Sequence, residues 1–366
     1  MTNRRTLIVG GAAVAATVVG GGTWAGFRQM GSMADFRAGI AALRAALPAD
    51  PAVRDLIRYA TLAANSHNTQ AWQFRPGKTR VDILPDPARR TPVVDPDDHH
   101  LFVSLGCAAE NLAVAAAARG RPSQAAFDPT GAGSVSVDLG TGASRNEALC
   151  DAIPSRQSTR ADFDGTPVSP ADLALLGQAG SVPGVEVILL TERARIDKLR
   201  DLVLAGNAAQ MADPAFMTEL KSWMRFSPRR ALATGDGLFG AVSGNPVLPE
   251  WLAPSLLKVV FAETSEARKY AGQIASSAGI AVFVGAEADP AHWVLVGRAC
   301  QRFALQATAL GLKHAFLNQP VEVPGFRAEL AALAGLPGRR PDLVMRFGRG
   351  TTLPYAARRP VDSVIV

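Results

Sequence analysis

A cluster of polar side chains interrupts an otherwise apolar stretch of the chain. Residues 65–70 read Asn-Ser-His-Asn-Thr-Gln, and they separate an apolar helical run from Trp72 and Phe74. These side chains donate and accept hydrogen bonds, so the cluster indicates hydrogen-bonding chemistry. It does not indicate a metal site, because neither His67 nor the histidine pair at 99–100 has partners at zinc-ligand spacing. The sequence also contains no obvious acid–base dyad or triad, so no residue is predicted to be catalytic.

The composition describes a globular protein with enough apolar residues for a large buried core. The chain has 366 residues, of which 48% are hydrophobic, a length that suits one or two domains. The net charge is +6, but acidic and basic residues alternate and no long Lys/Arg run marks a nucleic-acid face. The cysteines lie far apart, and Cys107 and Cys300 fall in apolar helical patterns that predict small buried thiols.

The elements that must position the polar cluster are long apolar helices and short strands, which together predict an α+β fold. The front half is predicted to contain a helix over 34–64 that is interrupted near Pro48 and Pro51, a strand–turn–strand over 72–86, a helix over 99–120 and a strand over 135–139. The back half is predicted to contain a helix, a polar segment and a second helix over 148–179, an irregular helical region over 192–260, a helix over 292–311, strands over 184–190, 279–286 and 342–350, and an extended tail over 355–366.

The N-terminus has the pattern of a targeting segment. Arg4 and Arg5 precede a Gly/Ala/Val-rich apolar stretch over residues 7–22. A basic start with a short apolar core is typical of export signals, and paired arginines indicate the twin-arginine route. We therefore expect residues 1–30 to engage the twin-arginine export machinery and the protein to be exported to the periplasm. The weak cleavage site also allows residues 7–22 to remain as a membrane anchor facing the periplasm, and a buried N-terminal helix is the other alternative.

Two regions of the chain follow the same pattern of elements. A strand, a long Ala-rich helix and a second strand occur near 75–140 and again near 280–348. We interpret this as a divergent internal duplication. Ordinary alternation of strands and helices in an α+β protein is the alternative.

Four segments, in order, resemble motifs of the FMN-dependent nitroreductase family. Residues 66–74 resemble its Ser-x-x-Asn-x-Gln-Pro-Trp segment, with Ala71 where the family usually has Pro. Residues 155–164 resemble its Arg-x-Ser-x-Arg/Lys segment, residues 311–320 resemble the stretch that meets the flavin ring, and residues 358–366 resemble its C-terminal Arg-x-Pro tail. The resemblance covers nearly the whole chain from about residue 34.

The distribution of these motifs implies a particular architecture. In ordinary members of the family, one short chain carries every motif, and two chains form an intertwined dimer with two FMN sites. Here a first repeat over 34–150 keeps the polar cluster, and a second repeat over 151–366 keeps the Arg-x-Ser-x-Arg segment and the tail. The resemblance therefore implies a nitroreductase-like α+β fold made of two tandem repeats, a monomeric pseudo-dimer with one complete FMN site and one erased.

The resemblance also implies roles for single residues. Arg156 and Arg359 are expected to bind the FMN phosphate with Ser158, because guanidinium groups suit a doubly charged anion, and Arg358 is the alternative if the tail is shifted by one residue. Arg160 is expected at the N1/O2 edge of the ring, where a cation stabilises the reduced form. The other expected cofactor-binding residues are Asn65, Ser66, Asn68 and Gln70 at the polar edge of the ring, and Leu317, Asn318 and Gln319 near N5.

Neighbouring residues are expected to support this site. Gln70 is expected to brace its loop, and His67 to line the site rather than act as a base. Trp72 and Phe74 are expected to pack in the core, because alternation along a strand favours burial.

The implied activity is that of an oxidoreductase. Hydride or electrons would pass through FMN from an NAD(P)H-like donor to a nitroaromatic or quinone-like acceptor. An insert near 219–250 fits neither repeat and is expected either to cover the site as a lid or to form an ordinary surface loop, with Arg225 and Asp236 as candidates to face a substrate. A lid that excludes nicotinamide would favour an FMN-binding or storage protein instead. A structural exported protein without flavin is a third alternative, which the intact Arg156, Ser158, Arg160 and Arg359 disfavour.

Overall fold

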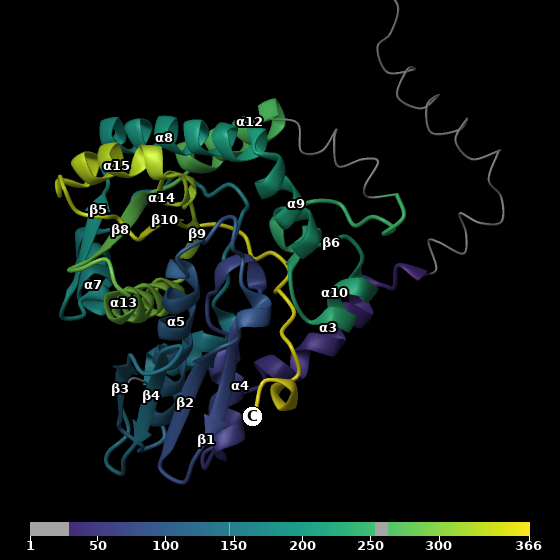
Figure 1. The fold of residues 1–366 in the computed structure, drawn as a ribbon, viewed down its shortest axis with the longest axis vertical. Coiled ribbons are helices and arrows are strands. Elements are labelled where there is room, and N and C mark those ends of the chain that lie inside the picture. The colour runs from purple at the N-terminus through teal and green to yellow at the C-terminus, as the bar shows by residue number, and fades with distance from the viewer. Residues whose placement is uncertain (1–28, 146, 253–262) are drawn as a thin grey trace, which may run out of the picture.

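The computed structural model describes residues 29–145, 147–252 and 263–366. Within these residues, two four-stranded antiparallel sheets lie on either side of two long central helices, and further helices cover the outer face of the second sheet (Figure 1). The α+β class predicted from the sequence is therefore confirmed. The expected signal or anchor at residues 1–30 lies almost entirely outside the described residues.

The first sheet comes from the front half of the chain. In spatial order its strands are β1 (Trp72–Pro76), β2 (Arg80–Pro85), β4 (Ser134–Leu139) and β3 (Ser123–Asp128). Helix α5 (His99–Ala117) connects β2 to β3 and packs against the sheet. Trp72 and Phe74 point to the buried face of β1 and are fully buried, as predicted from the alternation along this strand.

The second sheet comes from the back half and has the same order of strands. Its strands are β5 (Val185–Leu190), β8 (Gly279–Gly285), β10 (Leu343–Gly348) and β9 (Lys313–Phe316), and every neighbouring pair is antiparallel. Helix α13 (Pro290–Ala309) connects β8 to β9, as α5 connects β2 to β3. In each sheet, the strand that comes fourth along the chain therefore lies between the strands that come second and third.

Shorter elements surround the sheets and the central pair. The predicted helix over 34–64 is divided in two, because the chain around Pro48 and Pro51 is not helical. The surrounding elements are α3 (Met33–Ala41), α4 (Val53–Thr61), α6 (Glu147–Ala152), α7 (Pro170–Gly180), α8 (Arg193–Ala212), α9 (Pro214–Trp223), β6 (Met224–Arg225), α10 (Pro228–Thr234), β7 (Leu238–Phe239), α12 (Glu263–Ala275), α14 (Gln319–Glu322) and α15 (Arg327–Ala334).

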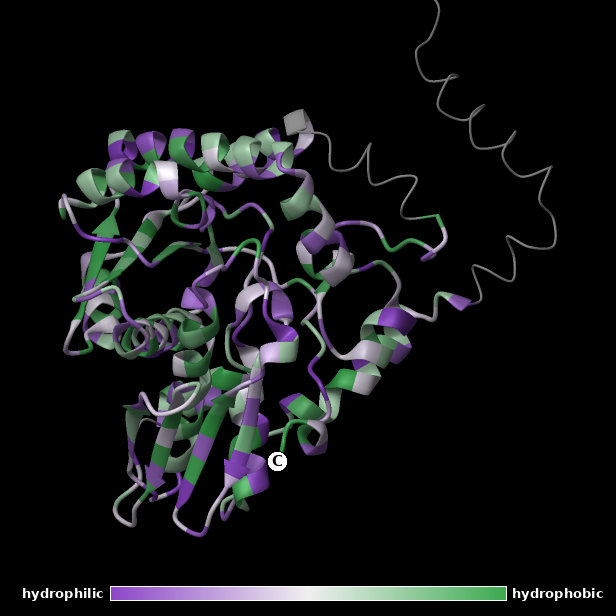
Figure 2. Ribbon diagram, viewed as in Figure 1, coloured by the Kyte–Doolittle hydropathy of each residue, from purple (hydrophilic) through white to green (hydrophobic). Residues whose placement is uncertain are grey.

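Strand β8 explains how one sheet serves two cores. All seven of its residues are buried. Ala281 and Phe283 face the larger core around α5 and α13, whereas Ile280, Val282 and Val284 face a second core beneath α8 and α15. Figure 2 agrees, with apolar strands inside and mixed colouring on the outer helices.

The two central helices touch through a reciprocal pair of glycines. A Cβ added at Gly106 would lie 2.1 Å from the Val294 carbonyl oxygen, and one added at Gly297 would lie 2.0 Å from the Val103 carbonyl oxygen. The two contacts are equivalent, because Gly106 lies three residues after Val103 on α5 and Gly297 lies three residues after Val294 on α13. Because any Cβ would overlap a backbone atom, this close approach requires glycine at both positions. Cys107 and Cys300, beside this crossing, are buried as predicted.

The C-terminal tail returns to the first sheet. Phe74 N donates to Val364 O at 2.7 Å, and Val366 N donates to Phe74 O at 2.9 Å. The end of the chain is thereby joined to the edge strand β1. Among the described residues, α5 is the one helix long and apolar enough to cross a membrane, and it is completely buried inside the protein.

Candidate functional site

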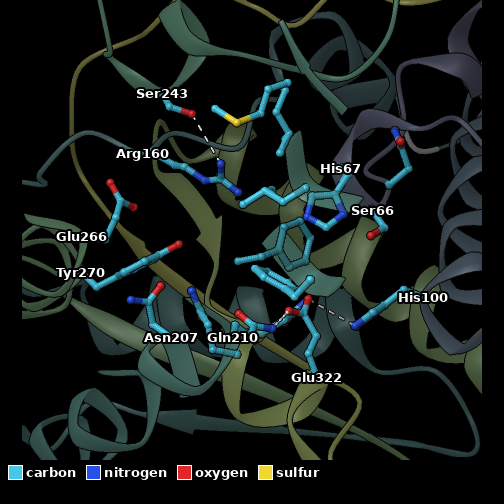
Figure 3. A pocket seen from close by; sticks show the side chains of 18 of the residues that line it. Ser66, His67, His100, Arg160, Asn207, Gln210, Ser243, Glu266, Tyr270 and Glu322 are labelled. Atoms are coloured by element: carbon cyan, nitrogen blue, oxygen red, sulfur yellow. Dashed lines mark hydrogen bonds and ion pairs between the residues drawn. The ribbon is translucent and has the colours of Figure 1, made fainter. Parts of the chain in front are cut away.

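A cavity of about 210 Å³ lies between the front and back halves of the chain. The front half contributes the loop at 64–67 and the first half of α5. The back half contributes Arg160, the segment at 316–322, and residues of α8 and α12. Figure 3 shows polar side chains from both halves pointing toward this space. The cavity brings together segments that are far apart in the sequence.

The polar cluster that follows α4 divides into two sets. Asn65, Ser66 and His67 line the cavity, whereas Asn68 and Gln70 are bonded to other segments of the fold. His67, Asn68 and Gln70 have φ values of 45°, 54° and 54°, a left-handed conformation that is uncommon outside glycine. Gln70 N donates to Asn65 Oδ1 at 3.0 Å and closes the loop.

Gln70 has the bracing role that the sequence suggested. Its side chain is fully buried, and Nε2 donates to Gly235 O at 2.8 Å. Its Oε1 accepts a hydrogen bond from Arg359 N at 2.9 Å. Asn68 acts similarly, because Nδ2 donates to Ala357 O and Oδ1 accepts from Arg358 Nη1 at 3.0 Å. These bonds attach the loop to the C-terminal tail.

Two of the expected phosphate-binding arginines meet at the end of α4. Arg156 Nη2 donates to Leu62 O, and Arg358 Nε donates to Thr61 O at 2.7 Å. Arg358 Nη2 reaches Ala63 O at 3.1 Å and Leu62 O at 3.4 Å. Both side chains are buried, and the burial lowers the pKa of each guanidinium. Their charges face the negative end of a helix dipole, and neither residue lines the cavity.

Three further predicted residues also lie outside the cavity lining. Arg359 Nη1 lies 3.3 Å from Gln70 O and 3.4 Å from Asp86 Oδ2. Ser158 forms a short parallel bridge with His314. Leu317 is buried in the second core, and its N–H donates to Val344 O. In this structure the three residues bond to segments outside the cavity.

Arg160 is the predicted arginine that does face the cavity. Its Nη1 lies 3.5 Å from Ser243 Oγ, and its carbonyl accepts from Gln273 Nε2 at 2.6 Å (Figure 3). Lys269 lines the same region, and its Nζ donates to Asn245 Oδ1 at 3.3 Å. Burial lowers the pKa of Lys269, and the nearby Arg160 lowers it further. This end of the cavity therefore holds two basic side chains together with Glu266, whose carboxylate opposes the lowering of the Lys269 pKa.

Asn318 and Gln319 also line the cavity. Asn318 Oδ1 accepts from Val344 N at 3.0 Å, which holds the segment against β10. Gln319 Oε1 is buried and has no hydrogen-bond partner among the described residues. An acceptor of this kind is rare in a folded protein.

A carboxyl group and two histidines also line the cavity. Glu322 Oε2 accepts from Gln210 Nε2 at 2.6 Å, and Glu322 Oε1 lies 3.5 Å from His100 Nε2. Burial raises the pKa of Glu322 to about 7. Burial also lowers the pKa of His67 to about 4, with Arg160 adding to the effect, and lowers the pKa of His100. Both imidazoles are therefore neutral at pH 7.

The insert near 219–250 forms part of the wall. Apolar residues of the insert and of the preceding α9 line the cavity: Phe216, Met217, Leu220, Met224, Leu238 and Phe239. Arg225 and Asp236, which we expected to face a substrate, do not line it. Arg225 Nη2 pairs with Asp236 Oδ1 at 2.7 Å, and Arg89 Nη2 binds the other oxygen of the same carboxylate. Their charges instead fasten the insert to the front half.

Several lining residues carry no clear signal in the sequence. Lys269 and Tyr270 lie in a stretch without any spacing pattern, and His100 stands out in the sequence only as one of a histidine pair. Glu322 follows the segment expected near the cofactor, so its position was the one usable signal. The spatial pairing of Glu322 with His100 depends on how α14 meets α5.

Comparisons with known proteins add the following. No family model matches the chain. Two curated proteins from two strains of Mycobacterium tuberculosis are each 25% identical over 340 residues, which cover 89% of this chain and 94% of theirs. Both carry the provisional name NAD(P)H nitroreductase.

Similar solved structures include an FMN-bound nitroreductase from Desulfitobacterium hafniense and the FMN-dependent nitroreductase NfnB from Mycobacterium smegmatis in complex with NADPH. The first is 16% identical, with a TM-score of 0.39, and covers 60% of this chain and 97% of its own. The second is 13% identical, with a TM-score of 0.41, and covers 59% of this chain and 96% of its own. Scores this low settle neither the fold nor the ligand of this chain.

Proposed function

We propose that this protein is an FMN-dependent oxidoreductase of the nitroreductase type, which passes electrons from an NAD(P)H-like donor to a nitroaromatic or quinone-like acceptor. The observation that carries the proposal is the shared cavity. It is lined by Asn65 and Ser66 from the front half and by Arg160, Asn318 and Gln319 from the back half, which are residues that the family motifs assign to FMN. The 25% identity to the mycobacterial proteins supports the same function.

The residues of the cavity wall fit a flavin ring. FMN, when bound, supplies hydride and electron chemistry that amino-acid side chains lack. Arg160 provides a cation for the edge of the ring that becomes negative on reduction. Gln319, Asn65 and Ser66 line the cavity and provide hydrogen-bonding side chains for the polar edge of the ring. The protein's own task is to bind and orient the reactants and to exclude water.

The position of the phosphate remains a prediction from the family motifs. Arg156 and Arg358 already lie together at Leu62 O, so a phosphate bound there would exchange carbonyl partners for anionic oxygens. Arg156 Nε is buried and has no partner among the described residues, which leaves one donor available. Ser158 and Arg359, which the family motifs also assign to the phosphate, contact other groups in this structure.

The tandem arrangement is part of the proposal. Two observations support a fused pseudo-dimer: both sheets have the same strand order, and Gly106 and Gly297 make reciprocal contacts across the central helices. In a two-fold interface, a residue i that contacts j is matched by a residue j that contacts i. We assign the repeats to 34–150 and 151–366, with one FMN per chain and a monomeric fused unit.

Export is proposed from the sequence alone. Arg4, Arg5 and the apolar stretch at 7–22 support recognition by the twin-arginine machinery, which carries folded proteins and so suits a cofactor acquired in the cytoplasm. The protein would be periplasmic, or anchored in the membrane through residues 7–22. Loss of export on replacing both arginines by lysine, with export retained after substitutions in the folded part, is the test.

One observation favours an alternative function. The insert contributes an apolar wall to the cavity and is fastened by the Arg89–Asp236–Arg225 ion pairs. Such a wall would cover the flavin and restrict access of a nicotinamide, as expected of an FMN-binding or storage protein with little reductase activity.

An anaerobic redox experiment separates the two functions. The reductase is expected to lose its yellow colour with NADH or NADPH and to regain it with a nitroaromatic or a quinone. A yellow protein that neither nicotinamide bleaches, but that dithionite does, would favour storage. A preparation that does not bind added FMN would contradict both.

A further inference from the structure

One wall of the cavity holds a carboxyl group for which the family motifs give no role. Glu322 lies at the end of α14, and its side chain is 16% exposed, toward the cavity that it lines. Gln210 holds one carboxyl oxygen at 2.6 Å, and His100 lies 3.5 Å from the other. Figure 3 shows the three side chains converging on one side of the cavity. The carboxyl is therefore fixed in position and still accessible from the cavity.

The surroundings let this carboxyl hold a proton up to about neutral pH and keep the His100 imidazole neutral. Burial, with the Asp95 carboxylate nearby, raises the pKa of Glu322 to about 7 against the opposing effects of Gln210 and Arg160. Burial lowers the pKa of His100, so at pH 7 the imidazole carries no extra proton. The other titratable or charged groups facing the pair are His67, His99, Tyr270, Arg327 and Arg340.

We propose that Glu322 donates a proton to the oxygen of the electron acceptor, with Gln210 and His100 positioning its carboxyl group. The inference rests on the proposed function, which supplies the class of acceptor and the electron pair. It adds a catalytic acid where the sequence alone indicated none.

The chemistry balances for both classes of acceptor. Reduction of a quinone to a hydroquinone consumes one hydride and one proton, and so does reduction of a nitro group to a nitroso group and water. The hydride comes from the NAD(P)H-like donor, which is oxidised. The O–H bond of Glu322 breaks, an O–H bond forms on the acceptor oxygen, and the carboxylate left behind regains a proton from water.

Anaerobic stopped-flow reoxidation tests this role. The FMN-loaded protein is reduced with NADPH or dithionite and then mixed with a quinone or with ferricyanide, which takes electrons without protons. In the parent, the quinone rate is expected to fall as pH rises through about 7, because the proton leaves Glu322. In Glu322→Gln the quinone rate at pH 6 is expected to fall about 100-fold or more, whereas the ferricyanide rate stays within about twofold.

Two further measurements make the result decisive. Glu329→Gln changes an exposed glutamate on α15 and is expected to behave like the parent with both acceptors. Infrared difference spectra, which need no turnover, are expected to contain a protonated carboxyl band that titrates near pH 7 and is absent from Glu322→Gln.

The outcomes distinguish the two levels of proposal. An FMN-loaded Glu322→Gln protein that reacts with quinone at the parental rate and pH profile would overturn the inference alone, as would spectra without the carboxyl band. A chain that binds no FMN would overturn the proposed function and this inference with it.

Discussion

At each end of the central helix pair, a loop packs over an equivalent residue of α5 or α13. The side chains at the two ends differ, and one end is part of the cavity. At one end, the loop at 64–67 lies over Ser104 of α5, whose hydroxyl is 3.4 Å from Ser66 N, and Ser104 lines the cavity. At the other end, the loop before β5 lies over Leu295 of α13, and a Cβ on Gly184 would be 3.3 Å from its side chain. Ser104 and Leu295 correspond, because each directly follows a valine of the reciprocal contact.

The connections beyond the helices differ in the same way. Strands β3 and β4 are joined by the short turn at 129–133, whereas β9 and β10 are joined by residues 317–342, which include α14 and α15. The longer connection brings Asn318, Gln319 and Glu322 to the cavity. A shared framework therefore does not make a site. The site depends on small polar residues on the helix and on an added segment that reaches them.

The largest effect is expected from breaking the framework that both ends share. Gly106→Ala and Gly297→Ala each place a Cβ about 2 Å from a backbone oxygen, so each is expected to lower the free energy of unfolding by about 3 kcal/mol. The two losses should be similar, because the contacts are reciprocal. Denaturant unfolding followed by circular dichroism measures them.

A helical glycine elsewhere provides the control for these substitutions. No neighbouring atom of the described residues lies within 4 Å of a Cβ added at Gly177 of α7. Gly177→Ala is expected to be neutral or to stabilise by about 0.5 kcal/mol. A well-tolerated Gly297→Ala beside a disruptive Gly106→Ala would contradict the reciprocal packing.

Exchanging the two corresponding residues sharpens the comparison of the ends. Ser104→Leu places an apolar side chain in the cavity and is expected to weaken FMN binding about 10- to 100-fold, or about 1.4–2.7 kcal/mol. Leu295→Ser removes apolar packing and is expected to cost about 1–2 kcal/mol of stability with FMN affinity unchanged. Quenching of FMN fluorescence gives the affinities. Equal losses of affinity in both variants would contradict a site confined to one end.

A pH-dependent effect is expected from His67, which has no counterpart in the loop before β5. Its pKa in the folded protein is about 4, below the ordinary value of 6.5, so the unfolded chain binds a proton that the folded protein does not. Stability should therefore fall as pH drops from about 6.5 to 4, as the unfolded chain takes up this proton.

Replacement by asparagine isolates that titration. Asparagine accepts the positive φ of His67 and has no proton to gain, so the difference in stability between His67→Asn and the parent should widen as pH drops through this range. Taking the difference cancels other groups, including Glu322, whose raised pKa makes stability fall as pH rises between about 4.5 and 7. A difference that does not change with pH would show that His67 titrates normally.

Much of the fold was readable from the sequence, for physical reasons. The helices α5 and α13 are long, apolar and ended by Gly120 and Gly311 in the sequence, and β8 is a continuous apolar run. Strands β3 and β9 were missed, because Ser123–Asp128 is only weakly patterned and Lys313–Phe316 is short. Their pairing with β4 and β10 overrides weak local preference.

The sequence predicted the lining residues of the candidate site only where those residues belong to a recognisable local motif. Asn65, Ser66 and Arg160 lie in segments with their own signals, and the structure brings them to one cavity. Arg156 and Arg358 carry the same chemical signal as Arg160, but their donors reach carbonyls at the end of α4. Which arginine faces a cavity depends on contacts between distant segments, and a local pattern contains no information on those contacts.

The central claim is that this chain holds a single FMN between its two halves, and the stoichiometry of released flavin tests it most directly. The protein is saturated with FMN, freed of excess, and denatured, and the absorbance of released FMN is compared with the protein concentration. We predict one FMN per chain. Two per chain would contradict the assignment of one site to one end of the helix pair, and none would contradict the flavin site itself.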